Sequence, residues 1–218
     1  MLNTLNSKKN KINALILAPH TDDGELGCGG TIAKLVSEGH SVYYVAFSAC
    51  YQSVLKEFKE DILITEVKSA TSILGIRPEN LILFDFEVRT FSFRRQEILD
   101  QLIKIREEIH PDLVLMPSTN DMHQDHITIA QEGLRAFKFN SIMSYEMPWN
   151  NLSFNTSSFV YLKEEHMKKK VKALSEYKSQ AHKSYANEEF IRSLARTRGV
   201  QIGTKYAETF DILRWIIN

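Results

Sequence analysis

Short apolar runs alternate along this chain with longer segments in which apolar positions recur every three to four residues. The apolar runs predict buried strands at 12–18, 41–47, 80–86, 113–116 and 141–146, and a run at 159–162 is compatible with another. The segments of helical period predict helices at 31–38, 55–73, 98–109, 128–137 and 164–179. Gly39, Gly75 and Pro111 stand where three of these helices would end. This alternation is typical of an α/β fold with a mostly parallel sheet and helices on both faces.

The same pattern predicts one Rossmann-like domain over residues 1–218, with residues 1–10 as a polar N-terminal tail. Beyond Pro148 the alternation weakens, and the remainder is predicted to be mainly a helical tail. No repeat, low-complexity tract or linker indicates a second domain. The apolar run after the tail is too short for a signal peptide, and no stretch approaches the roughly 18 apolar residues of a membrane span.

Composition narrows the class of protein further. Among 218 residues, 27 Lys and Arg balance 27 Asp and Glu, which argues against nucleic acid as a partner because nucleic-acid binders carry a basic excess. With 43% apolar and 25% charged residues, the chain is predicted to be soluble and globular. Two cysteines, Cys28 and Cys50, exclude a disulfide-built secreted scaffold, so a cytoplasmic location is expected.

A glycine-rich cluster, residues 19–30, follows the first predicted strand. It is not a dinucleotide fingerprint, whose third glycine would fall at Ile32, and no Gly-Lys pair makes it a P-loop. The glycines indicate tight turning and close backbone approach instead. The cluster also contains His20, Asp22 and Asp23, whose imidazole and carboxylate groups are ligands for a divalent metal such as zinc. The alternative is that one aspartate merely caps the following helix.

A second polar cluster, residues 118–126, follows the fourth predicted strand and contains His123, Asp125 and His126. Ligands of open α/β sheets sit beyond the carboxyl ends of the strands, so both clusters are candidates for one site. Three protein ligands and an open water position are typical of a hydrolytic zinc site. His20, Asp23 and His126 would supply that set and leave Asp22 and His123 for proton chemistry. Asp125 would orient an imidazole, or cap the helix that follows.

These residues resemble the motifs of the PIG-L/LmbE family of zinc-dependent N-deacetylases. The family pattern (A/P)-H-x-D-D-E-x-x-G-x-G-G resembles residues 19–30, and H-x-D-H resembles residues 123–126; segments 177–180 and 198–210 are similar to the bacterial branch. The resemblance implies an LmbE-like fold and Zn²⁺, or another divalent metal such as Fe²⁺, held by His20, Asp23 and His126. It makes Asp22 the general base and His123 the electrostatic or acid partner.

One departure from the family pattern falls inside the first motif. Gly24 stands where the family usually has glutamate, and Glu25 follows one place later. The change at position 24 puts in doubt an interaction that supports the metal ligands, but it affects none of the predicted ligands themselves.

The resemblance implies a metal-dependent hydrolase that removes the acetyl group from an N-acetylated amino sugar, such as an N-acetylglucosamine conjugate, sugar nucleotide or glycan precursor. Zinc-activated water would attack the acetyl carbonyl, Asp22 would accept its proton, and Asp22 or His123 would protonate the leaving amine. Arg89, Glu146 and Trp149 are predicted to contact this small-molecule substrate, although Arg89 could equally be an exposed surface residue and Trp149 structural.

Two alternatives remain open from the sequence. The nearer is a metal-dependent amidase that acts on a different acyl or amide conjugate, and the other is a nucleotide-binding α/β module. A serine hydrolase is not indicated, since no G-x-S-x-G elbow occurs. The sequence leaves a homo-oligomer open as the assembly.

Overall fold

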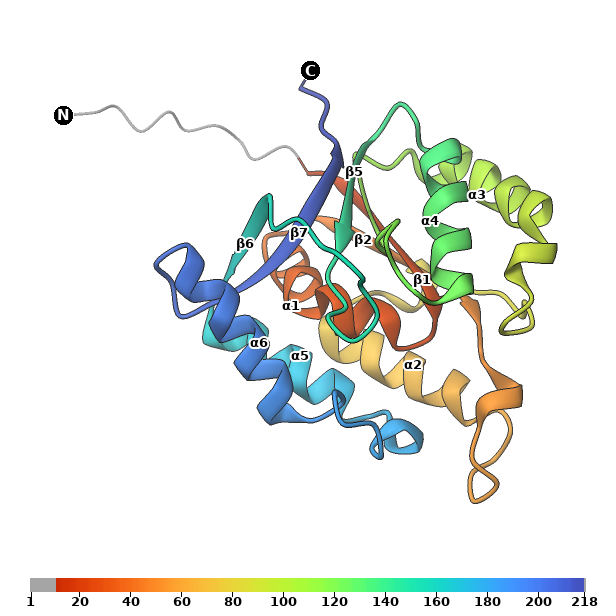
Figure 1. Ribbon diagram of the computed structural model, residues 1–218, viewed down its shortest axis with the longest axis horizontal. Coiled ribbons are helices and arrows are strands. Elements are labelled where there is room, and N and C mark those ends of the chain that lie inside the picture. The colour runs from red at the N-terminus through yellow and green to blue at the C-terminus, as the bar shows by residue number, and fades with distance from the viewer. Residues whose placement is uncertain (1–10, 218) are drawn as a thin grey trace.

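The computed structural model describes residues 11–217, which form a seven-stranded mixed sheet between two layers of helices (Figure 1). The strands are β1 (Asn13–His20), β2 (Ser41–Ser48), β3 (Leu81–Leu83), β4 (Leu113–Met116), β5 (Ser141–Tyr145), β6 (Ser158–Leu162) and β7 (Tyr206–Arg214), in the order β3-β2-β1-β4-β5-β7-β6. The helices are α1 (Asp23–Ser37), α2 (Ile62–Leu74), α3 (Arg95–Ile109), α4 (Gln124–Ala136), α5 (Glu164–Leu174) and α6 (Glu188–Gln201). Neighbouring strands from β3 to β5 are parallel, and β7 is antiparallel to both of its neighbours. The predicted fold class is confirmed.

Strand β1 lies in the middle of the sheet and is buried on both faces. Ala14, Ile16 and Ala18 belong to a core that includes side chains of α1, α2, α5 and α6. Leu15 and Leu17 belong to a second core, on the side of α3 and α4. Successive side chains of a strand point to opposite faces, so an uninterrupted apolar run is what a strand covered on both sides requires.

The helix predicted at 31–38 begins at Asp23, so most of the glycine-rich cluster is helical, contrary to the sequence-based expectation of a loop. A kink at Cys28 (φ −144°, ψ 25°) divides α1. The Glu208 carboxylate of β7 accepts hydrogen bonds from the backbone N–H groups of Gly30 (2.9 Å) and Thr31 (2.6 Å) and so caps the second part. Lys170 donates to the carbonyl of Leu26 before the kink (2.7 Å) and to Glu208 (2.6 Å). These contacts satisfy backbone groups on both sides of the kink.

Other boundaries also differ from the predictions. Helix α2 begins at Ile62, β3 has only three residues, α4 begins earlier, at Gln124, and α5 ends at Leu174. The prediction of a helical tail is wrong, because β7 follows α6 and inserts between β5 and β6. Glu208, Thr209 and Asp211 interrupt the apolar residues of β7, and the structure buries the first two of them. The predicted tail at 1–10 lies outside the described residues, and no helix in the described part is long and apolar enough to cross a membrane.

Candidate metal centre

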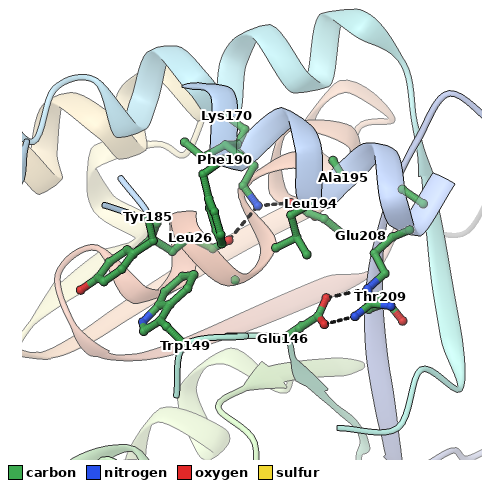
Figure 2. Close-up of a pocket in the computed structure, with 14 residues that line it drawn as sticks. Leu26, Glu146, Trp149, Lys170, Tyr185, Phe190, Leu194, Ala195, Glu208 and Thr209 are labelled. Carbon is green, nitrogen blue, oxygen red and sulfur yellow. Dashed lines mark hydrogen bonds and ion pairs between the residues drawn. The ribbon is translucent and has the colours of Figure 1, made fainter. Parts of the chain in front are cut away.

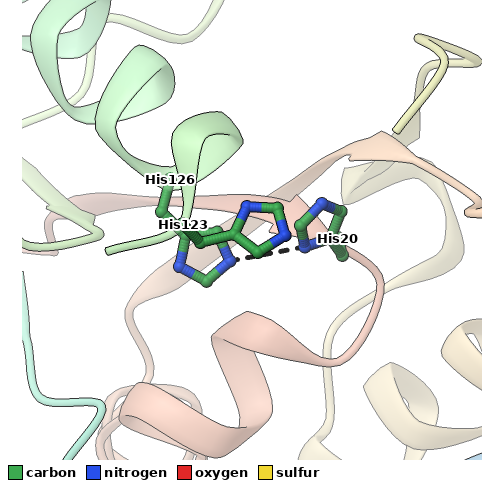
Figure 3. Close-up of side chains that lie close together, drawn as sticks. All are labelled: His20, His123 and His126. Atoms are coloured by element: carbon green, nitrogen blue, oxygen red, sulfur yellow. Dashed lines mark hydrogen bonds between the residues drawn. The ribbon is translucent and has the colours of Figure 1, made fainter. Parts of the chain in front are cut away.

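The two polar clusters meet at one edge of the sheet. His20 is the last residue of β1, and Asp22 and Asp23 stand at the start of α1. Strand β4 pairs in parallel with β1, and the chain that leaves it brings His123 and His126 to the start of α4. His20, His123 and His126 lie together in Figure 3. An open cavity lies over these residues and Asp22.

Three donor atoms of the predicted ligand set converge. His20 Nδ1 lies 3.1 Å from Asp23 Oδ2, His126 Nε2 lies 3.2 Å from the same oxygen, and the two nitrogens are 3.3 Å apart. Zinc bonds of about 2.0–2.2 Å in a tetrahedron place neighbouring ligand atoms roughly 3.3–3.5 Å apart. These three atoms therefore have the spacing of one face of a zinc site. The alternative trio of His20, His123 and His126 is looser, with donor atoms within 4.8 Å of one another.

Two further carboxylates orient the imidazoles from behind. His20 Nε2 lies 3.1 Å from Asp125 Oδ2, and His126 Nδ1 lies 2.8 Å from Asp121 Oδ2. Each ring can donate its outer N–H to a carboxylate and present its other nitrogen to a metal, which is the usual support for histidine ligands. Asp121 was not singled out from the sequence, although it belongs to the same polar cluster.

The charges of this centre fit a divalent cation. Asp23, Asp121 and Asp125 are all buried, with relative exposures of 6%, 2% and 0%. Burial opposes protonation of His126, but Asp23 and Asp121 outweigh it and raise its pKa to about 10. Burial disfavours ionised Asp23, yet His126 and His20 hold the pKa of Asp23 well below its usual range. Buried carboxylates in excess of cations are the electrostatic setting of a bound metal.

Asp22 and His123 face the same cavity. Asp22 occupies the N-cap position of α1 but makes no capping hydrogen bond, contrary to the alternative of a mere helix cap. The cap of α4 is His123, whose Nδ1 accepts from the N–H of Asp125 (3.2 Å), so Asp125 is not that cap. Burial and the neighbouring His20 and His126 lower the pKa of His123 to about 4. His123 is therefore neutral near pH 7 and carries its proton on Nε2.

The three residues predicted to contact substrate are placed differently. Arg89 and Trp149 line the cavity. Arg89 has a left-handed backbone (φ 71°), and its N–H donates to Asp125 Oδ2 (2.6 Å), which fixes it beside the candidate metal centre. Glu146 instead lines a small neighbouring pocket (Figure 2) and forms a two-pronged ion pair with Arg198. A contact between Glu146 and the substrate remains a prediction. The position of Glu146 outside the site cavity does not support it.

Gly24, the departure from the family motif, is explained by Tyr44. A Cβ atom at position 24 would lie 2.5 Å from Tyr44 Cε2. The Tyr44 hydroxyl accepts from the N–H of Gly24 (3.1 Å) and contacts the carbonyl of Thr21 (2.9 Å) and the carboxyl group of Glu25. The Tyr177 hydroxyl contacts the Thr21 carbonyl (2.6 Å) and the Glu25 carboxyl group (2.9 Å) as well.

Glu25 is thus buried behind the candidate metal centre, and its side chain does not line the cavity. Burial raises its pKa to about 8, although the two tyrosines oppose the shift. Both tyrosines hold the backbone of the His20–Asp23 segment through the Thr21 carbonyl. Tyr177 belongs to segment 177–180, which resembles the bacterial branch, but the sequence predicted neither tyrosine as a contact of the His20–Asp23 segment.

Comparison with known proteins gives a family and a fold. The model of the GlcNAc-PI de-N-acetylase family, PIG-L, matches residues 15–137. YaiS of Escherichia coli K12, described as an uncharacterized deacetylase, is 29% identical over 183 residues, which cover 80% of this chain and 95% of YaiS.

Two solved structures share the fold. N,N'-diacetylchitobiose deacetylase from Pyrococcus horikoshii has a TM-score of 0.78 and 24% identity, covering 97% of this chain and 87% of its own. GalB of Pseudomonas putida KT2440, a 4-carboxy-2-hydroxymuconate hydratase, has a TM-score of 0.76 and 19% identity, covering 95% and 98%. Since these neighbours include two kinds of enzyme, the fold does not select the reaction.

Proposed function

Because the chain belongs to the PIG-L family of deacetylases, we propose that it is a zinc-dependent hydrolase that removes the acetyl group from an N-acetylated amino sugar. The observation that carries the proposal is the convergence of His20 Nδ1, Asp23 Oδ2 and His126 Nε2 at 3.1–3.3 Å from one another. The hydratase among the structural neighbours shares the fold, whereas the family match favours deacetylation.

His20, Asp23 and His126 would hold the metal. When bound there, zinc supplies a water whose pKa is lowered to about 7, so that a nucleophile exists near neutral pH. Two nitrogen donors and one oxygen donor also suit Fe²⁺, so metal analysis of the purified protein has to identify the ion. Asp125 and Asp121 would keep the two imidazoles in the orientation that binding requires.

Asp22 would act as the general base. Its carboxylate lines the cavity, makes no helix-capping bond and lies next in sequence to a metal ligand. It would accept a proton from the attacking water while the water oxygen bonds to the acetyl carbon. The same proton would then pass to the nitrogen as the C–N bond breaks, which releases acetate and the free amine.

His123 would stabilise the oxygen that becomes negative during the attack. Its Nδ1 accepts a hydrogen bond from Asp125, so the proton on Nε2 is free to donate into the cavity. Of the two roles that the resemblance implies, electrostatic or acid partner, a neutral His123 would take the electrostatic one, and a hydrogen-bond donor of this kind is worth about 2.7–4 kcal/mol in the transition state. A neutral His123 also leaves Asp22 as the acid that protonates the amine.

The substrate class is proposed from the family and from the cavity wall. The P. horikoshii neighbour acts on N,N'-diacetylchitobiose by its name, which supports an N-acetylated amino sugar here. Among residues 11–217 the Arg89 guanidinium has no carboxylate partner, and its bond to the Ser53 hydroxyl (2.9 Å) leaves other N–H groups free. Arg89 would bind a hydroxyl, carboxylate or phosphate, and Trp149 would contact a sugar ring. A reducing cytoplasm as the location fits the two free, buried cysteines.

The test is acetate release from N-acetylglucosamine, diacetylchitobiose and a panel of N-acetylhexosamine conjugates, followed by mass spectrometry. Activity should disappear after chelation, return with zinc and be about 10²–10⁴-fold lower in Asp22→Asn. The panel includes N-propionyl and N-benzoyl analogues, and turnover of these alone would favour the alternative of another amidase. A zinc-loaded protein that cleaves none of these compounds would refute the proposal.

A further inference from the structure

The segment between α5 and α6 reaches back to the motif that carries the general base. The Tyr177 hydroxyl lies 2.6 Å from the Thr21 carbonyl, and Lys183 Nζ lies 3.5 Å from Asp22 Oδ2. Lys183 lines the site cavity together with Asp22. One segment thus holds both the backbone of the motif and the side chain of Asp22.

We propose that Lys183 is a positioning residue for Asp22: it holds one carboxylate oxygen so that the other faces the attacking water. The inference rests on the proposed function, in which Asp22 is the base. Within residues 11–217, Lys183 is the one side chain that hydrogen-bonds or ion-pairs with the Asp22 carboxylate. Without it, the carboxylate would be free to change rotamer, since no capping bond holds it.

The position of the ammonium group is itself fixed by its surroundings. The N–H of Lys183 donates to the Gln180 carbonyl in a turn (3.0 Å), and its Nζ lies 5.7 Å from the centroid of the Tyr185 ring. Tyr185 in turn stacks on Trp149, with ring centroids 4.1 Å apart and an interplanar angle of 2°. The lysine therefore approaches Asp22 from a supported wall of the cavity.

The strength of the contact suits a base that has to accept and return a proton. At 3.5 Å the pair is at the long end of hydrogen bonding, and the side chains keep 30% and 11% exposure. Such a pair orients the carboxylate without competing strongly for the oxygen that takes the proton. The neighbouring Asp22 raises the pKa of Lys183, so the ammonium stays charged near neutral pH.

The test compares Lys183→Met, which removes the charge at nearly constant size, with Lys183→Arg, which keeps it. Lys178→Met is the matched control, because Lys178 lies exposed on the same segment and bonds only the Ser175 carbonyl. Lys183→Met should lower kcat about 10–100-fold, as expected for a misplaced base, with KM changed less than about twofold. Metal content and melting temperature should stay at the parent values, and Lys183→Arg should recover most of the lost kcat.

The same change is then made in the Asp22→Asn background. If Lys183 acts through Asp22, Lys183→Met should cause no further loss of the residual turnover there. A rise in KM at constant kcat would instead make Lys183 a substrate contact, and an equal loss of kcat in both backgrounds would make it independent of Asp22. Either result, or an unchanged kcat, overturns the proposal.

The proposed function fails separately from this inference. The proposed function is refuted if the zinc-loaded parent protein releases no acetate. In that case the proposed role of Lys183 is refuted as well. An active parent with an inactive Asp22→Asn and an unaffected Lys183→Met would overturn only the role of Lys183.

Discussion

Replacing Gly24 by alanine is predicted to destabilise the protein, although alanine is the better helix former. The new Cβ would lie 2.5 Å from Tyr44 Cε2 and 2.8 Å from both Cζ and the hydroxyl oxygen. Gly24 is not one of the positive-φ glycines of the described chain, so backbone strain plays no part. The Tyr44 ring has to move, and it carries the hydroxyl that contacts the Gly24 N–H and the Thr21 carbonyl.

The magnitude follows from these contacts. Overpacking a full core costs about 1–3 kcal/mol, and each weakened hydrogen bond of the Tyr44 hydroxyl costs about 1 kcal/mol. The helical preference of alanine returns up to about 1 kcal/mol. The expected net loss in the free energy of unfolding is therefore about 2–4 kcal/mol, which for a chain of this size lowers the melting temperature by on the order of 10 °C.

Urea and thermal unfolding of Gly24→Ala, Tyr44→Leu and the double variant measure this effect. Tyr44→Leu removes the ring, so the penalty of Gly24→Ala should largely vanish in that background. Gly29→Ala is the milder comparison in the same helix, because its Cβ would lie 3.1 Å from Lys170 Cγ and at least 3.5 Å from the next nearest atoms. Gly24→Glu, which restores the residue usual in the family, should be worse than Gly24→Ala. A parent-like Gly24→Ala, or the same penalty with and without the Tyr44 ring, would refute the reasoning.

Three further outcomes are expected. Asp22→Asn should retain bound metal but lose about 10²–10⁴-fold in kcat. Acetate release and metal analysis measure this, and full activity would refute the role of Asp22 as the general base. Lys170→Met leaves the Glu208 carboxylate buried without a cation and should lower the free energy of unfolding, measured in urea, by about 3–5 kcal/mol. Adding Glu208→Gln should restore part of this loss. A loss under about 1 kcal/mol for Lys170→Met would contradict the reasoning. In chelator-treated protein, the folded pKa of His126, about 10, lies above its ordinary 6.5. Its stabilisation is therefore complete below pH 6.5 and is lost as pH rises towards 10; a flat or rising stability over that range in urea unfolding would contradict the pKa.

The local pattern of the chain determined the class of fold and the location of the candidate site. Strand β1 is apolar at successive positions, which is the requirement for a strand buried on both faces. The clusters around His20 and His126 follow two strands that proved to be parallel neighbours, so their carboxyl ends bring them together. A polar cluster that follows an apolar run can be recognised from the local sequence, without knowledge of the rest of the chain.

The helix start at Asp23 and the strand β7 escaped prediction for a common reason. The kink in α1 is capped by Glu208, which lies 178 residues from Gly30. Strand β7 mixes apolar and charged residues without a regular period, and it pairs along both edges with β5 and β6, which lie far from it in the sequence. Periodicity describes only neighbours along the chain, so elements that depend on distant partners give no local signal.

The sequence alone was enough to select candidates for metal and proton chemistry, since imidazoles and carboxylates gathered at strand ends are a local feature. Only the tertiary structure decided how these groups are held. Asp121 orients His126, Tyr44 takes the space that Gly24 leaves open, and Lys183 meets Asp22 from 161 residues away. These contacts depend on distances of a few ångströms between segments that the fold alone brings together, and such distances are not encoded in any single stretch of the chain.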